Sequence, residues 1–199
     1  MDRLVLINRA LLRIGSTALQ GEDDPGAEVK LAVYDGVRDS VLGGYPFSFC
    51  KAKRKLTRLV ASPVAQWTYA YQLPSDRVGS VRAIYPASDS RKPTTAYDII
   101  GADLVSDLEA LWAEYVTGET LARWPGDFTE FFTKALMAEF ALSVREDRAL
   151  HDRLYQECFG TPTQMAQGGL YGRAMENDAQ QLPEREIAGG DNPLIDARY

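Results

Sequence analysis

The sequence predicts an α+β fold: a discontinuous antiparallel helical bundle with an inserted small antiparallel β-domain and an extended C-terminal arm. Apolar residues recur at helical spacing near both ends of the first 180 residues, alternate at strand spacing between them, and thin out in a polar tail. We expect the bundle to comprise residues 1–50 and 119–180, the β-domain residues 51–118, and the tail residues 181–199. A chain that starts a bundle, leaves it for a sheet and returns makes the helical domain discontinuous.

The first helix is predicted from an apolar stripe near the N-terminus. Leu4, Ile7, Leu11 and Ile14 follow one another at three- and four-residue steps, which places them on one helix face. Gly15 is expected to end this helix, because glycine is favoured just beyond a helix C-terminus.

A second helix is predicted to follow a polar loop that spans residues 16–26. Asp24 is expected to cap it, with Pro25 in its first turn and the glycine pair 43–44 at its end. Two amphipathic helices joined by a loop of this length favour an antiparallel hairpin, and neither can cover the whole apolar face of the other. The face of this second helix consists of Val29, Ala32, Val33, Val37 and Val41.

An aromatic segment and several short strands are predicted next. Residues 45–50 contain three aromatic rings and a proline, so we expect an extended or turned segment whose rings close the end of the bundle. The alternation beyond them predicts four to six antiparallel strands, including a hairpin with a short turn that contains Gly101. The strand segments are residues 67–73, 78–85, 97–100, 104–106 and 111–117, with Val81, Ala83 and Tyr85 on one face and Ile84 on the other.

Five basic residues fall within eight positions at the start of the β-domain: Lys51, Lys53, Arg54, Lys55 and Arg58. The simpler interpretation is a solvated or edge strand whose lysines prevent unwanted strand pairing. The alternatives are a strip that faces phosphates in a DNA passage or lies at a partner surface, and a small nucleic-acid-binding module that also uses Trp67 and Tyr69. All of these interpretations stay open from the sequence.

The chain is then predicted to return to helix. Asp127 is expected to cap this helix, with Glu130 three residues later as in a capping box. Large rings and alanines follow at helical spacing from residue 128 to 142, so this helix should be the most buried one. A further helix includes residues 150–158, and Thr161 is expected to cap a last segment from 163 to about 180, which three glycines weaken.

The sequence offers little that points to catalysis. Its one histidine, His151, lies between charged residues on a predicted helix, and the two cysteines Cys50 and Cys158 are far apart in sequence. No metal ligand spacing, nucleophile triad or phosphate-binding glycine loop is present, so we expect no enzyme activity, no cofactor and no metal. A net charge of −6 disfavours a nucleic-acid coat, and the absence of a long apolar run predicts a soluble, unprocessed chain without a membrane partner.

Four segments resemble a known family of phage proteins. Residues 6–15, 34–42, 45–49 and 67–76 are similar to stretches of the head-to-tail adaptors of tailed bacteriophages, the tail tubular protein A type of short-tailed phages. The resemblance extends over about residues 1–180 and does not include residues 160–172 or the tail. Its motifs are packing and turn patterns.

The resemblance implies a structural virion protein at the head–tail junction, assembled in the host cytoplasm. Such adaptors form a ring, here expected to contain twelve subunits, beneath the portal protein, extend the DNA conduit and attach the tail nozzle or tail tube. Genomic DNA would pass through the lumen without specific binding. The tail is either a disordered terminus or an arm that orders on a partner, and the resemblance implies the portal, with contacts from Leu182, Pro193, Leu194, Ile195 and Tyr199.

Overall fold

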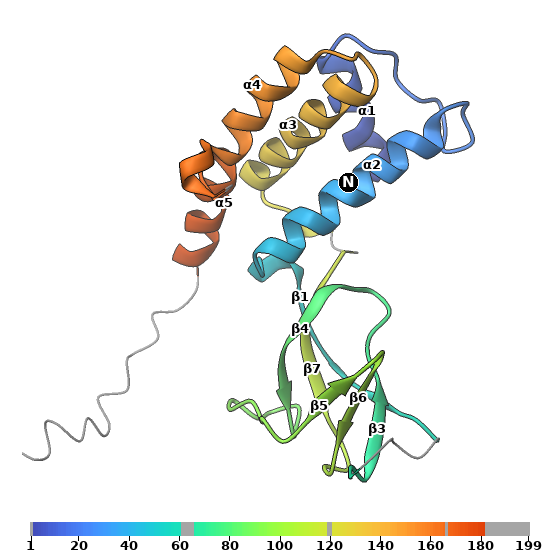
Figure 1. Ribbon diagram of the computed structural model, residues 1–199, viewed down its shortest axis with the longest axis vertical. Coiled ribbons are helices and arrows are strands. Elements are labelled where there is room, and N and C mark those ends of the chain that lie inside the picture. Colours follow the sequence, from blue (N-terminus) through green and yellow to red (C-terminus); the bar gives the residue numbers. More distant parts are fainter. Residues whose placement is uncertain (1, 61–65, 119–120, 166, 182–199) are drawn as a thin grey trace, which may run out of the picture.

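The computed structural model describes residues 2–60, 66–118, 121–165 and 167–181. Within these ranges the fold is α+β, with a helical bundle at one end and two antiparallel sheets at the other (Figure 1). Of the tail expected at residues 181–199, all but Gln181 lies outside the described residues. None of the helices described here combines the length and hydropathy that a membrane span requires.

The bundle is built around one central helix. α3 packs against all of the other helices of the described chain, and ten of its side chains are buried, so the prediction that it is the most buried helix is confirmed. Figure 1 shows α2 and α4 on either side of α3. The helices are α1 (Arg3–Arg13), α2 (Ala27–Gly44), α3 (Gly126–Ser143), α4 (Arg148–Phe159) and α5 (Gly169–Gln180).

Both predicted aspartate caps are wrong, because another residue occupies the N-cap position of each helix. Gly26, in a left-handed conformation with φ 77°, occupies the N-cap position of α2, and the Asp24 carboxylate accepts from the backbone of Gln20 instead. Pro25 therefore precedes the helix. Pro125 is the N-cap of α3, which places Asp127 inside the first turn, where Asn177 of α5 donates to it at 2.8 Å.

The last helical segment also begins later than predicted. Thr161 caps a short 3-10 helix, η3 (Pro162–Gln164), in a capping box with Gln164, and α5 starts only at Gly169. Gly169 has φ 59°, and a Cβ atom there would lie 2.5 Å from the carbonyl oxygen of Glu157, so glycine is required for the close approach to α4. The predicted weakening by glycine thus falls mostly before the helix interior.

Two small antiparallel sheets form the β-lobe, with strand orders β1-β7-β4 and β2-β3-β6-β5. The β5-β6 hairpin closes through Gly101 in a left-handed conformation, as predicted. In β4 the register shifts between Val78 and Ala83, so this strand does not keep one regular alternation. The strands are β1 (Lys51–Lys55), β2 (Thr57–Arg58), β3 (Tyr69–Gln72), β4 (Arg77–Tyr85), β5 (Asp98–Ile100), β6 (Asp103–Ser106) and β7 (Trp112–Thr117).

The two halves of the chain have separate cores that meet at one junction. Phe47, fully buried just before the 3-10 turn η1 (Ser48–Cys50), packs its ring edge-to-face against Phe128 of α3 with centroids 4.7 Å apart. This confirms that the aromatic segment closes the end of the bundle. Val78 of β4 and Val116 of β7 belong to the bundle core, while Ile84 and Tyr115 belong to the core of the β-lobe. The two strands therefore connect both cores.

Candidate functional site

The basic residues of the predicted strip do not form one continuous surface. β1 is an edge strand of its sheet, as the simpler interpretation predicted. Side chains alternate along a strand, so Lys51, Lys53 and Lys55 share one face and Arg54 lies on the other. Arg58 belongs to β2, in the second sheet, because the chain changes sheets at the buried Leu56.

Each of four basic side chains has a partner within the β-lobe. Lys53 Nζ donates to the carbonyl oxygens of Ser88 and Ser90 at 2.9 and 3.1 Å and lies 3.8 Å from the centre of the Tyr85 ring. Arg54 pairs with Asp76 at 3.2 Å. Lys55 lies over Trp112 at 5.5 Å and Arg58 over Tyr69 at 4.0 Å. A phosphate would have to compete with these contacts, and phosphate binding by the strip stays a prediction.

The portal-binding residues predicted in the tail, Leu182, Pro193, Leu194, Ile195 and Tyr199, lie outside the described residues. His151, the one histidine, is half-buried on α4, with Nδ1 2.9 Å from Asp152 Oδ1 and its ring stacked on Tyr155. In the part of the chain that the structure describes, no three histidine, cysteine or acidic side chains are grouped so that they could hold a metal ion.

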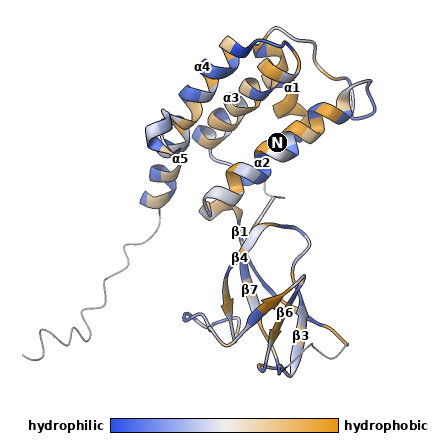
Figure 2. Cartoon of the chain, viewed as in Figure 1, coloured by the Kyte–Doolittle hydropathy of each residue, from blue (hydrophilic) through white to orange (hydrophobic). Residues whose placement is uncertain are grey.

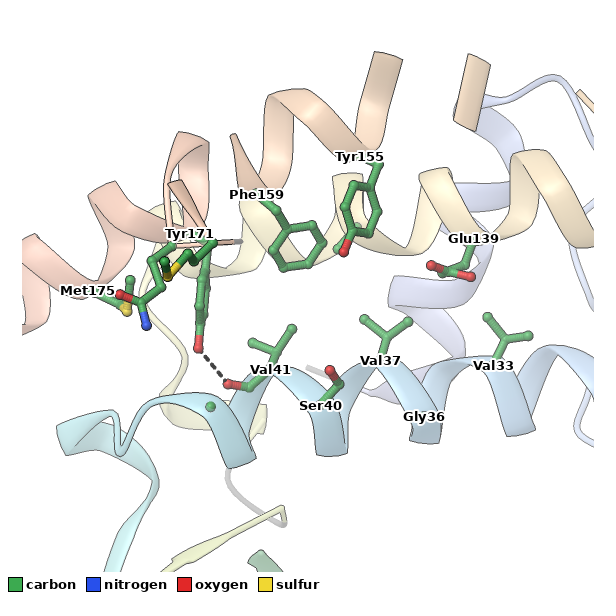
Figure 3. Close-up of a pocket in the computed structure, with 14 residues that line it drawn as sticks. Val33, Gly36, Val37, Ser40, Val41, Glu139, Tyr155, Phe159, Tyr171 and Met175 are labelled. Atoms are coloured by element: carbon green, nitrogen blue, oxygen red, sulfur yellow. Dashed lines mark hydrogen bonds between the residues drawn. The ribbon is translucent and has the colours of Figure 1, made fainter. Parts of the chain in front are cut away.

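An open apolar groove runs along the bundle between α2 and the α4–α5 side, with α3 as its floor (Figure 3). Its volume is about 510 Å³. Val33, Val37 and Val41 of α2 point toward the aromatic side chains of α4 and α5 across it. The full set of lining residues is Val33, Gly36, Val37, Ser40, Val41, Gly44, Ala135, Glu139, Tyr155, Phe159, Met165, Gln167, Tyr171 and Met175.

The two walls of the groove differ in the size of their side chains. On α2, Gly36, Ser40 and Gly44 follow at four-residue steps, so small residues stand in a row along the face that opens to the groove. On the opposite side Met165 is 85% exposed and Tyr155 is partly exposed at the rim. A wall with little side-chain bulk lets another backbone approach closely, as in helix–helix contacts.

One end of the groove is closed by a hydrogen bond between its walls. The Tyr171 hydroxyl donates to the carbonyl oxygen of Val41 at 3.0 Å (Figure 3). Burial raises the pKa of Tyr171 to about 12, so the hydroxyl keeps its proton at neutral pH. Behind this contact α5 is anchored by the buried Asp178, whose carboxylate accepts from the Ser48 backbone at 3.0 and 3.1 Å. Hydrogen bonds therefore hold α5 against α2 and the η1 turn at this end of the groove.

Charge is sparse in the groove. Glu139 of α3 carries the one carboxylate among its described lining residues, and this group makes no hydrogen bond or ion pair with any part of the chain described here. An unpaired, half-buried carboxylate in an apolar groove favours an occupant that brings a positive charge.

A second apolar surface lies on α1. Val5 is 54% and Leu12 61% exposed, and they are seven positions apart, so they share one face of the helix. Arg9 lies between them in sequence, but Glu130 of α3 binds its guanidinium at 2.9 Å and that of Arg13 at 2.5 Å. The arginine charges are thus held toward α3. Figure 2 shows hydrophobic stretches along α1 and α2 among the bundle helices.

Sequence reasoning identified only part of the groove. The pattern of α2 indicated an apolar face that its hairpin partner could not cover, and Val33, Val37 and Val41 were in that set. The contribution of Tyr155, Phe159, Tyr171 and Met175 was missed, because it depends on the separation of α4 from α2 across α3. The row of small residues on α2, Gly36, Ser40 and Gly44, was the sequence feature that could have indicated a groove along this helix.

Neither a model of any known protein family nor any curated protein sequence matches this chain.

Proposed function

We propose that this protein is a structural virion protein, a head-to-tail adaptor that forms a ring beneath the portal, extends the DNA conduit and attaches the tail nozzle. It acts at the head–tail junction of a virion that is assembled in the host cytoplasm, as a non-enzymatic building block. The observation that carries this proposal is the presence of two exposed apolar surfaces on the bundle, the groove and the Val5–Leu12 face of α1.

A closed ring requires that one surface of each subunit fit a different surface of the next. The groove and the face of α1 supply one concave and one convex apolar surface on the same bundle. Val5 and Leu12 are separated by about 10 Å along the helix, and the α2 wall from Val33 to Gly44 extends over about 16 Å. The convex surface therefore fits within the length of the concave one, and we assign the lateral contact to this pair.

The β-lobe supports the proposal through its connection and its charge. Val78 and Val116 enter the bundle core, so the lobe is attached by packed strands and can extend a tube without a hinge. Four of its basic side chains, Lys53, Arg54, Lys55 and Arg58, contact rings, carbonyls or Asp76, and the whole chain carries a net charge of −6. Weak attraction for phosphate suits a conduit, because each neutralised phosphate would add salt-sensitive affinity and slow the passage of DNA.

The mass of the protein with and without the portal protein of the same phage tests the proposal. We expect a large complex that contains several copies once the portal is present, and a monomer without portal is compatible with this. Leu12→Asp should prevent the complex, because it places a charge in the apolar contact, whereas Ile100→Asp on the exposed β5 strand is the matched control and should leave it intact. Failure of the wild-type protein to bind portal would refute the proposal.

A further inference from the structure

We infer that, in the free protein, the groove between α2 and the α4–α5 side binds the C-terminal segment of the same chain, with Leu194 and Ile195 against its apolar walls and Arg198 at Glu139. This inference goes beyond the adaptor function, which could fail without affecting it. The groove is then an intramolecular peptide-binding site, and its occupant has to leave before another surface can enter.

The tail is long enough to reach the groove. Met175 of α5 lines the groove, and α5 ends five residues later at Gln180, about 8 Å further along the helix. Eighteen residues follow the last described one, Gln181. The twelve steps from residue 182 to 194 can extend over about 40 Å, more than twice the length of the α2 wall. Gly189 and Gly190 lie within that stretch, and glycine permits the chain to reverse.

The end of the tail and the groove match in composition. The end of the tail reads Leu194-Ile195-Asp196-Ala197-Arg198-Tyr199, which joins two large aliphatic residues to an acidic, a basic and an aromatic one. The groove offers valines, rings and small residues with a single carboxylate, Glu139, that lacks a described partner. Arg198 supplies the positive charge that this carboxylate lacks, in surroundings where an ion pair is less screened than on an open surface.

The tail is present at the groove at a high effective concentration because it belongs to the same chain. A segment attached to one wall of its own binding site is present there at an effective concentration in the millimolar range. Even a weak fit then fills the site in the free protein. A neighbouring subunit that presents Val5 and Leu12 would have to displace the segment, so that groove binding and lateral assembly compete.

Cysteine cross-linking of the full-length chain tests the inference without any partner protein. Ser40→Cys in the groove is combined with Ile195→Cys in the tail, and both native cysteines are fully buried. We expect a cross-linked product at monomer mass, in about tenfold higher yield than from Asp39→Cys with Ile195→Cys, which places the thiol on another face of the same helix. Equal yields from both pairs would overturn the inference. A product at dimer mass would also overturn it, by assigning the groove to a second copy.

The charge contact has its own matched control within the tail. Arg198→Glu should lower the monomer cross-linking yield severalfold, because it brings a second negative charge to Glu139. Arg185→Glu makes the same change of charge near the start of the tail and should leave the yield unchanged. Equal losses from the two variants would contradict the placement of Arg198. Since portal is absent from these experiments, their failure is distinct from failure to form a ring.

Discussion

The helical bundle and the β-lobe differ in what their surfaces offer, although each exposes some apolar side chains, such as Ile99 and Ile100 on β5. The bundle exposes apolar side chains on α1 and along the groove, although its core already holds most of the aromatic rings of the chain. The lobe has a smaller core, and four of the five basic side chains of β1 and β2 contact rings, carbonyls or Asp76. Under the proposed function, the contacts with neighbouring subunits and with portal lie on the bundle. Variants in each of the two regions test this difference.

The junction between the two regions should be the most sensitive position. Phe47→Ala removes a fully buried ring that contacts Tyr45, Phe49, Phe128 and Tyr171. We expect the free energy of unfolding to fall by about 3–5 kcal/mol, because the ring leaves a cavity at the end of the bundle. Urea denaturation measures the change.

Leu12→Ala serves as the control for this loss. The same measurement should show a change within about 0.5 kcal/mol, because Leu12 is mostly exposed in the free chain. A small effect at Phe47 would mean that the bundle end is not closed by this ring.

The contact between Asp178 and Ser48, which anchors α5, should have the second-largest effect on stability. Asp178→Ala leaves the partly buried backbone N–H and the hydroxyl of Ser48 without their acceptor, which should cost about 1–3 kcal/mol. Hydrogen exchange should quicken in α5 more than in the sheets, since only the bundle wall depends on this contact. Asp178→Asn keeps an acceptor oxygen and should lose less. Equal exchange changes in α5 and in the β-lobe would argue against a local anchor.

The arginine pair on α1 should give a smaller, pH-dependent effect. The hydrogen bond from Arg13, assisted by the charge of Arg9, holds the pKa of Glu130 below its ordinary value. Its stabilising contribution is therefore complete above the unfolded pKa of about 4.3 and is lost as pH falls through the lower folded pKa. Glu130→Gln should cost under about 1 kcal/mol at neutral pH, since solvent screens this partly exposed pair.

Denaturation at several pH values checks the sign of this effect. The stability difference between the wild type and Glu130→Gln should shrink in acid and in high salt. A difference that grows as the pH falls would contradict the assigned ion pair.

Neutralising the β1 strip should have the smallest effect on assembly. Lys53→Gln, Arg54→Gln and Lys55→Gln combined remove exposed charges whose partners lie within the lobe, so complex formation with portal should be unchanged. Under the nucleic-acid-binding alternative, the same triple variant would abolish salt-dependent DNA binding. Titration with duplex DNA at two salt concentrations separates the two interpretations.

The sequence predicted elements with strong periodicity and missed features that depend on distant parts of the chain. The burial of α3 and the Gly101 hairpin followed from local patterns. The caps at Asp24 and Asp127 failed because α2 begins after Gly26, in a left-handed conformation, and α3 begins after Pro125, in an extended one, so neither aspartate occupies the N-cap position. The change of sheet at Leu56, which separates Arg58 from the lysines, has no local signal.

The groove shows the same division. Its α2 wall could be read from the valines and small residues, whereas the opposite wall required knowing how far α4 stands from α2 across α3. A surface formed by one helix can be predicted from its sequence pattern. A surface enclosed between two helices cannot, because it depends on how the helices pack.

Hydroxyl-radical footprinting of the protein alone and bound to portal tests most directly whether the bundle carries the assembly contacts. Val5 and Leu12 on α1, and Ile99 and Ile100 on β5, are all exposed in the free chain and report on the two regions. We predict that Val5 and Leu12 lose most of their reactivity in the complex while Ile99 and Ile100 retain theirs. Protection confined to β5, with α1 unchanged, would contradict the account.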